Sequence, residues 1–105
     1  ETAPAAGGAP ATAAATGVLE ALEQVIASRR EEMKEGSYTT YLFEKGLEKI
    51  RKKTGEEAIE LLLATDPKEV TSEAADLLYH LLVLLRALEI PLSSVLGELE
   101  TRLKR

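Results

Sequence analysis

Four carboxylates lie at helical spacing inside two apolar stretches of the sequence. Glu57 and Glu60 belong to GEEAIELLLA, while Glu73 and Asp76 belong to EAADLLYHLL. Acids three residues apart in a helix are neighbours on one face. From Ala58 to Ala64, Glu60 is the only polar residue, and a helix that is apolar all round is buried all round. Acids in such positions repel each other and lose hydration, so we expect a cation between them.

The chemistry of this carboxylate cluster depends on how the two stretches pair. If they form an antiparallel helical hairpin, the four carboxylates converge and offer only oxygen ligands. Such ligands suit Mg²⁺, Mn²⁺ or Ca²⁺. A magnesium ion that keeps water positions can take up phosphate oxygens and activate a bound water. The pattern therefore predicts phosphoanhydride hydrolysis.

A lysine-rich segment, KGLEKIRKK, precedes the first acid pair. Its ammonium groups lie on the turns before the acids and are candidates for binding a polyphosphate. The alternative is a solvated helix face, on which the lysines pair with Glu44 and Glu48. The four lysines are Lys45, Lys49, Lys52 and Lys53.

Other polar and aromatic side chains in these stretches have more than one interpretation each. Glu56 is an outer metal ligand, a base acting through water, or an exposed acid. His80 shares a face with the acids, but a lone histidine among leucines favours a hydrogen-bonded core residue over a ligand. Tyr38, Tyr41 and Phe43 are favoured as core anchors over a platform for a nucleotide base.

The apolar spacing predicts an all-α fold, a bundle of about four helices, because no alternating strand pattern occurs. Gly36 ends the first helix, and Gly46 and Gly55 are candidate bends in the second. Asp66 followed by Pro67 and Glu69 is a typical helix start. The helices are expected over Val18 to about Glu35, Ser37 to about Ala64, Asp66 to about Glu89, and Pro91 onward.

Length and charge limit the class of protein. A chain of 105 residues is one small domain, and such domains often bury a face against a second copy. A net charge of −5 and a pI of about 5.0 exclude a basic surface for nucleic acid. The chain has no cysteine, so thiol catalysis, disulfides and thiolate metal sites are excluded.

Two segments bear on location. Leu77 to Leu88 is too short and too polar to span a membrane, so we expect a buried helix there. Residues 1–17 are rich in alanine, glycine, proline and threonine, which predicts a flexible tail or linker before a domain over 18–105. This start lacks the basic region of a secretory signal, and we therefore expect a cytoplasmic location with no membrane partner.

Three segments together resemble one enzyme family. SYTTYLFEKGLEKIRKKTGEEAIELLLA, EAADLLYHLLVLL and IPLSSVLGELETR are similar to the phosphoribosyl-ATP pyrophosphohydrolases of histidine biosynthesis, over about residues 18–105. GEEAIE fits the E-E-x-x-E motif, and EAAD the E-x-x-D motif, of the wider MazG-like all-α nucleoside triphosphate pyrophosphohydrolases. Pro91 and the alanine-rich tail depart from the family pattern, and neither lies in the candidate site.

The resemblance implies a homodimeric, magnesium-dependent bundle that converts phosphoribosyl-ATP to phosphoribosyl-AMP and pyrophosphate, the second step of the pathway. Mn²⁺ is a possible substitute. In some organisms this activity is fused to a phosphoribosyl-AMP cyclohydrolase. The implied residues are Glu57, Glu60, Glu73 and Asp76 as metal ligands, Glu56 as an accessory catalytic acid beside Glu57 and Glu60, Lys49, Lys52 and Lys53 as phosphate contacts, and Ser37, Tyr38 and Lys45 at the entrance.

Two alternatives remain open. One is a house-cleaning pyrophosphohydrolase for another nucleoside triphosphate. The other is a non-catalytic helical dimerisation module whose acids are merely solvated. A di-iron bundle is disfavoured, because the Glu-x-x-His pairs of such sites are absent.

Overall fold

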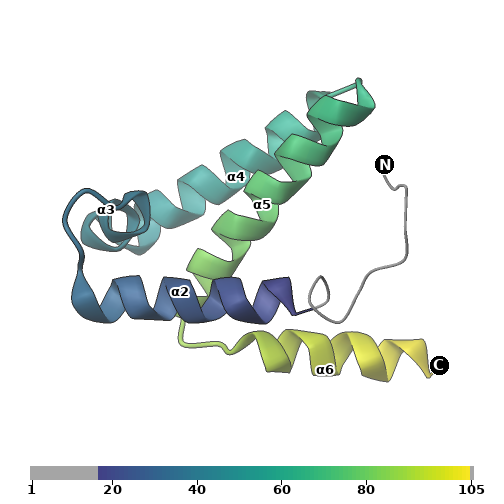
Figure 1. The fold of residues 1–105 in the computed structure, drawn as a ribbon. Helices are drawn as coiled ribbons and strands as arrows, with labels where there is room; N and C mark the ends of the chain where they lie inside the picture. Colours follow the sequence, from purple (N-terminus) through teal and green to yellow (C-terminus); the bar gives the residue numbers. More distant parts are fainter. Residues whose placement is uncertain (1–16, 105) are drawn as a thin grey trace.

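The computed structural model describes residues 17–104, and this part of the chain contains helices and no strand (Figure 1). The predicted all-α class is therefore confirmed for these residues. The segment expected as a single helix from Ser37 is two helices, which makes five in the described part instead of about four. They are α2 (Val18–Glu32), α3 (Tyr38–Lys45), α4 (Leu47–Leu63), α5 (Pro67–Ala87) and α6 (Leu92–Leu103).

The helix α2 ends earlier than the expected Glu35. Met33 adopts a left-handed conformation with φ of 52°, and its backbone N–H donates to the Arg29 carbonyl at 2.8 Å. This bond closes the last turn of the helix. Gly36, with φ of 85°, then lies in the turn before α3. The connection between α2 and α3 thus contains two left-handed positions, and glycine supplies only the second.

Gly46 separates α3 from α4. Its φ of 95° and ψ of 179° lie in a backbone region that is essentially restricted to glycine. Gly55, the other expected bend, lies inside the unbroken helix α4. The two glycines therefore differ in role, because only Gly46 has a conformation that other residues avoid.

An antiparallel hairpin of α4 and α5 carries the acid-rich stretches (Figure 1). The turn between them ends as predicted at Asp66, whose side chain accepts a hydrogen bond from the Glu69 N–H at 3.3 Å, with Pro67 in the first turn. Thr54 joins the two helices, since its Oγ1 donates to the Ile50 carbonyl at 2.8 Å and lies 3.4 Å from the His80 carbonyl.

The hydrophobic core lies where α2 and α3 cross the lower part of this hairpin (Figure 1). The start of α6 adds Leu92 to it. Glu23 of α2 holds this end by accepting a hydrogen bond from the Leu92 N–H at 2.8 Å. The buried apolar residues are Ile26, Leu42, Ile50, Leu82, Val83 and Leu92.

The expectation that α4 is buried all round is wrong for the single chain. Ile59 is 58%, Leu62 82% and Leu63 74% exposed. Figure 1 shows the reason: this end of the α4–α5 hairpin extends beyond α2 and α3, so only α5 packs against it. The apolar residues here face solvent on the sides that no other helix covers.

Two of the expected aromatic core anchors are also wrong. Tyr38 is 44% and Tyr41 38% exposed, whereas Phe43 packs against the core as expected. The short helix α3 packs through Thr39, Thr40 and Leu42, while the two tyrosines remain partly exposed.

Within residues 17–104 no single helix is both long enough and apolar enough to cross a membrane; α5 and α6 together pass on length and composition, but they are bent by 112°. The cytoplasmic location and the domain boundaries stay predictions. The predicted tail at 1–17 lies outside the described residues, apart from Gly17.

Candidate metal centre and its surroundings

Three of the four predicted metal ligands converge across the hairpin. Glu57 and Glu60 of α4 and Glu73 of α5 each offer a carboxylate oxygen, and the three oxygens lie within 4.8 Å of one another. Glu57 is only 8% exposed, Glu73 is half-buried and Glu60 is exposed. The spacing of the acids on two antiparallel helices therefore brings three of the four acids together, and their role as metal ligands stays a prediction.

The electrostatics of Glu73 suit a bound cation. Its Oε1 is buried and has no hydrogen-bond partner. Lost hydration raises the pKa of Glu73, and the negative charges of Glu60, Asp76 and Glu57 raise it further. An unpaired buried carboxylate oxygen beside other acids is destabilising unless a positive charge is added. These oxygen donors fit a hard divalent cation such as Mg²⁺.

Asp76 lies next to the three glutamates but outside their group. Its carboxylate is close enough to raise the pKa of Glu73, and its residue is exposed. A fourth oxygen ligand is thus available on the same side of α5.

Glu56 forms an ion pair with a lysine. Its Oε1 lies 3.4 Å from the Lys53 Nζ, one turn earlier on α4. The hydrogen bond to Glu56 raises the pKa of Lys53, and the charge of Glu57 adds to this effect. Lys53 is therefore the lysine that stands beside the acid cluster.

His80 is a hydrogen-bonded core residue, as favoured from the sequence. Its Nδ1 lies 2.8 Å from the Asp76 carbonyl, and its Nε2 lies 2.9 Å from the Tyr38 hydroxyl. Because a carbonyl only accepts, Nδ1 carries a proton and donates to it. The hydrogen bond between Tyr38 and His80 ties α3 to α5 beside the cluster, and burial raises the pKa of Tyr38.

Lys45, Lys49 and Lys52 lie together in a separate cavity of about 550 Å³, with Tyr41 and Glu48. In the described part of the chain these lysines form no ion pair with Glu44 or Glu48, so the solvated-pair reading is not borne out. The four predicted phosphate-binding lysines are thus divided between two places.

Ser37 and Tyr38 line another cavity, of about 330 Å³, whose charged residues are Glu35 and Glu44. No basic residue lines it. The Ser37 hydroxyl accepts a hydrogen bond from the Thr40 N–H at 3.3 Å and so caps α3. Its described role is structural, and its predicted place at the site entrance stays a prediction.

Sequence reasoning missed the surroundings of Tyr41. This ring lies beside three lysines, with the Lys45 Nζ at 5.8 Å from its centre. Tyr41 and Lys45 are four residues apart on one helix, and this spacing was a signal that the expectation of a buried tyrosine obscured.

A family model described as phosphoribosyl-ATP pyrophosphohydrolase matches residues 19–103, nearly the whole described chain. The chain belongs to this family. It is 54% identical over 87 residues to the phosphoribosyl-ATP pyrophosphatase of Listeria welshimeri, a match that covers 81% of this chain and 84% of the relative.

Longer relatives match equally well. The chain is 56% identical over 89 residues to the histidine biosynthesis bifunctional proteins HisIE of Halalkalibacterium halodurans and Bacillus subtilis. Each match covers 82% of this chain but only 42% and 43% of the relatives. The chain therefore spans less than half the length of these bifunctional proteins.

Proposed function

We propose that this chain hydrolyses phosphoribosyl-ATP to phosphoribosyl-AMP and pyrophosphate, with Mg²⁺ held by Glu57, Glu60, Glu73 and Asp76. The observation that carries the proposal is the convergence of three carboxylate oxygens within 4.8 Å, in a chain of the phosphoribosyl-ATP pyrophosphohydrolase family. The buried, unpaired Oε1 of Glu73 supports a cation at this place.

Each group near the cluster has a proposed task. When bound, Mg²⁺ neutralises phosphate charge and lowers the pKa of a coordinated water. Water attacks at the α–β phosphoanhydride, a new phosphorus–oxygen bond forms, and the anhydride bond breaks to release pyrophosphate. Glu56, whose Oε1 lies 3.4 Å from the Lys53 Nζ, is the accessory carboxylate that takes up the proton of the attacking water. Lys53 also offers its ammonium group to phosphate oxygens.

The test is pyrophosphate release from phosphoribosyl-ATP, measured beside ATP and a panel of other nucleoside triphosphates. We expect turnover with Mg²⁺, retention of activity with Mn²⁺ and loss with a chelator. Glu60→Gln and Asp76→Asn should each lower kcat roughly 10²-fold or more, because each removes a charged ligand. The matched control is Glu100→Gln, which removes a carboxylate from the exposed side of α6.

Each alternative predicts a different result. If the chain prefers a free canonical or damaged nucleotide as its substrate, it is a house-cleaning pyrophosphohydrolase and this proposal is wrong. If no triphosphate is hydrolysed and neither variant changes thermal stabilisation by Mg²⁺, the chain is a non-catalytic helical module.

We also propose a homodimer. Its support is the exposed apolar surface of the α4–α5 hairpin. Ile59, Leu62 and Leu63 lie at its free end and Leu78 and Leu81 lie further along α5, and these five residues are 37–82% exposed. An apolar surface of this extent is typical of a protein interface. A second copy of the chain, with the same apolar residues, is the proposed partner.

A fusion with phosphoribosyl-AMP cyclohydrolase is a further hypothesis. Its support is that relatives matched over 42–43% of their length are named bifunctional proteins of histidine biosynthesis. The mass of the native gene product tests it, and a product that ends with this chain would refute it.

A further inference from the structure

The lysine cavity defined above is a concentrated positive surface on an acidic protein. Tyr41, Lys45, Glu48, Lys49 and Lys52 line it, three ammonium groups against one carboxylate. Within residues 17–104 none of these three lysines forms an ion pair. Unpaired ammonium groups around one cavity are suited to an anionic group such as a phosphate.

An exposed pair of tyrosines lies between this cavity and the acid cluster. The rings of Tyr38 and Tyr41 are stacked, with their centres 5.9 Å apart and their planes at 22°. Tyr41 lines the lysine cavity. The Tyr38 hydroxyl forms a hydrogen bond with His80, which lies one turn after Asp76 on α5. The Tyr38 ring also stacks on Tyr79, with their centres 6.1 Å apart, so the pair offers a nucleotide base its exposed ring edges. The pair thus provides an aromatic surface that reaches from the lysines to the acids.

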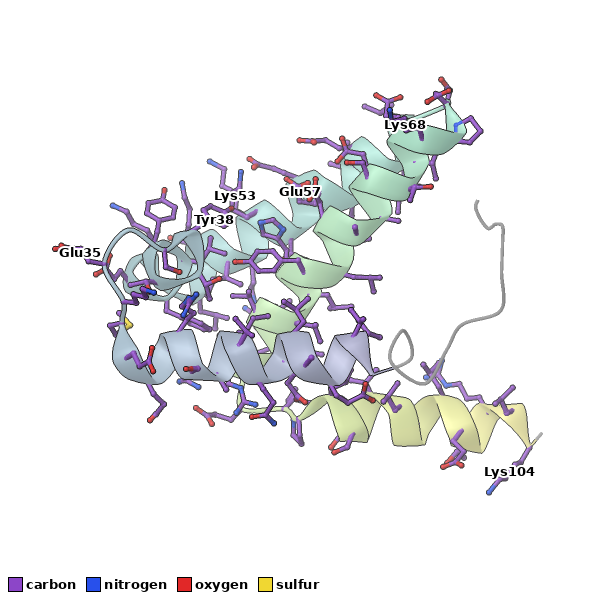
Figure 2. All side chains as sticks on the ribbon, in the orientation of Figure 1. Glu35, Tyr38, Lys53, Glu57, Lys68 and Lys104 are labelled. Atoms are coloured by element: carbon purple, nitrogen blue, oxygen red, sulfur yellow. The ribbon has the colours of Figure 1, made fainter. Side chains whose placement is uncertain are left out.

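Two lysines of the cavity and the first acid pair follow one another along α4. Lys49 and Glu60 are about three turns apart, so their side chains leave the helix in nearly the same direction. At 1.5 Å per residue, the Cα atoms of Lys49 and Glu57 are about 12 Å apart along the axis. Figure 2 shows Tyr38, Lys53 and Glu57 in this order towards the free end of the hairpin. None of the cluster carboxylates lines the lysine cavity.

We propose that the cavity of Lys45, Lys49 and Lys52 binds the phosphate on the second ribose of phosphoribosyl-ATP and so distinguishes this substrate from ATP. The inference rests on the proposed function and extends it. Phosphoribosyl-ATP carries a triphosphate on one ribose, the adenine between its two riboses, and a single phosphate on the second ribose. The acids, the tyrosine pair and the lysine cavity occur in the same order. ATP has no group for the lysine cavity.

The experiment compares the affinities of two ligands, of which only one carries the second ribose and its phosphate. Calorimetric titration in Mg²⁺ measures the Kd of phosphoribosyl-AMP and of AMP for the wild-type chain and for Lys49→Gln/Lys52→Gln. We expect the Kd of phosphoribosyl-AMP to rise about tenfold or more, because charge-assisted hydrogen bonds are lost. The Kd of AMP should change by less than about twofold, since AMP has no group that reaches the lysines.

Two further variants support the comparison. Lys45→Gln removes the ammonium group beside Tyr41 and should also weaken phosphoribosyl-AMP more than AMP. Lys68→Gln removes one positive charge from the exposed start of α5, near the far end of the hairpin (Figure 2), and should leave both Kd values unchanged.

Equal weakening of both ligands would overturn the inference, since the lysines would then bind the part that the ligands share. An unchanged Kd for phosphoribosyl-AMP would overturn it as well. Hydrolysis of phosphoribosyl-ATP by the wild-type sample is measured separately. Its absence would sink the proposed function, whereas normal hydrolysis with an unchanged affinity ratio would sink only the role of the lysine cavity.

Discussion

Glu57 combines two features that rarely occur together, a carboxylate and a core position. It is 8% exposed, and helical spacing places it on the side of α4 that carries the buried Ile50. Glu60 and Glu73 bring their oxygens within 4.8 Å, and the Glu73 Oε1 has no partner. Burial and repulsion both disfavour this arrangement in the absence of a cation. The acid cluster therefore lowers the free energy of unfolding of the metal-free chain, and metal binding can restore it.

Glu57→Gln tests this view by heat denaturation. Without metal, we expect the melting temperature to rise by about 2–6 °C, because the variant keeps the side-chain shape and removes roughly 0.5–1 kcal/mol of repulsion. With excess Mg²⁺, the wild-type chain should gain stability and the variant should gain little. At a metal concentration of 100 Kd, the gain for one site is about 2.7 kcal/mol.

Glu100→Gln on the exposed side of α6 is the control for loss of a carboxylate. It should follow the wild-type chain with and without Mg²⁺. A Glu57→Gln chain that melts lower without metal and still gains stability from Mg²⁺ would show that the acids do not form a shared cation site.

At the scale of elements, two glycines in one segment have opposite roles. Gly46 has φ of 95° and separates α3 from α4, whereas Gly55 lies within α4. At neither position would an added Cβ meet another atom within 4 Å. Substitution by alanine therefore reports backbone conformation alone.

Gly46→Ala and Gly55→Ala form a matched pair for this comparison. Gly46→Ala should lower the free energy of unfolding by about 1–3 kcal/mol, because alanine is strained at this φ. Gly55→Ala should raise it by about 0.5–1 kcal/mol, because alanine loses less entropy in a helix. Urea unfolding followed by circular dichroism measures both. If the two variants shift stability in the same direction, the break at Gly46 is not set by its backbone conformation.

Gly46 also lies between the two groups of residues that line the lysine cavity. The residues before it supply Tyr41 and Lys45, and the residues after it supply Lys49 and Lys52. These residues follow one another at intervals of three and four, so a continuous helix would also bring them to one side. The break at Gly46 therefore sets the angle between the two groups and not which residues share the cavity.

For the whole molecule, the free end of the α4–α5 hairpin is the feature that a single chain leaves unexplained. Figure 1 shows this end extending past the other helices, and Leu62 and Leu63 there are 82% and 74% exposed. Apolar side chains at this exposure gain stability only when another surface covers them. A second copy of the chain is the proposed cover.

Leu62→Glu tests the dimer by light scattering after size-exclusion chromatography. We expect the wild-type chain to be a dimer and the variant a monomer at micromolar concentration. An unpaired charge in an interface costs about 3–5 kcal/mol, which weakens association 10²-fold or more. Leu103→Glu, at the 84% exposed end of α6, is the control and should remain dimeric. If Leu103→Glu dissociates and Leu62→Glu does not, the interface is on α6.

Much of the fold follows from local sequence features. Asp66, Pro67 and Glu69 predict the start of α5 because a cap acts within four residues. The apolar spacing similarly predicts α2, α5 and α6 to within about three residues. The break at Gly46 was named only as a bend, since glycine permits several conformations and its neighbours decide which one forms.

The sequence by itself determined the helical class, the acid pairs and the family motifs, because each depends on spacing along one chain. Only the tertiary structure decided which side chains meet. It joined Glu73 of α5 to Glu57 and Glu60 of α4, and it placed three of the four lysines in a cavity apart from these acids. It also left the apolar end of α4 exposed, since burial depends on which helices reach a given turn and not on the apolar pattern alone.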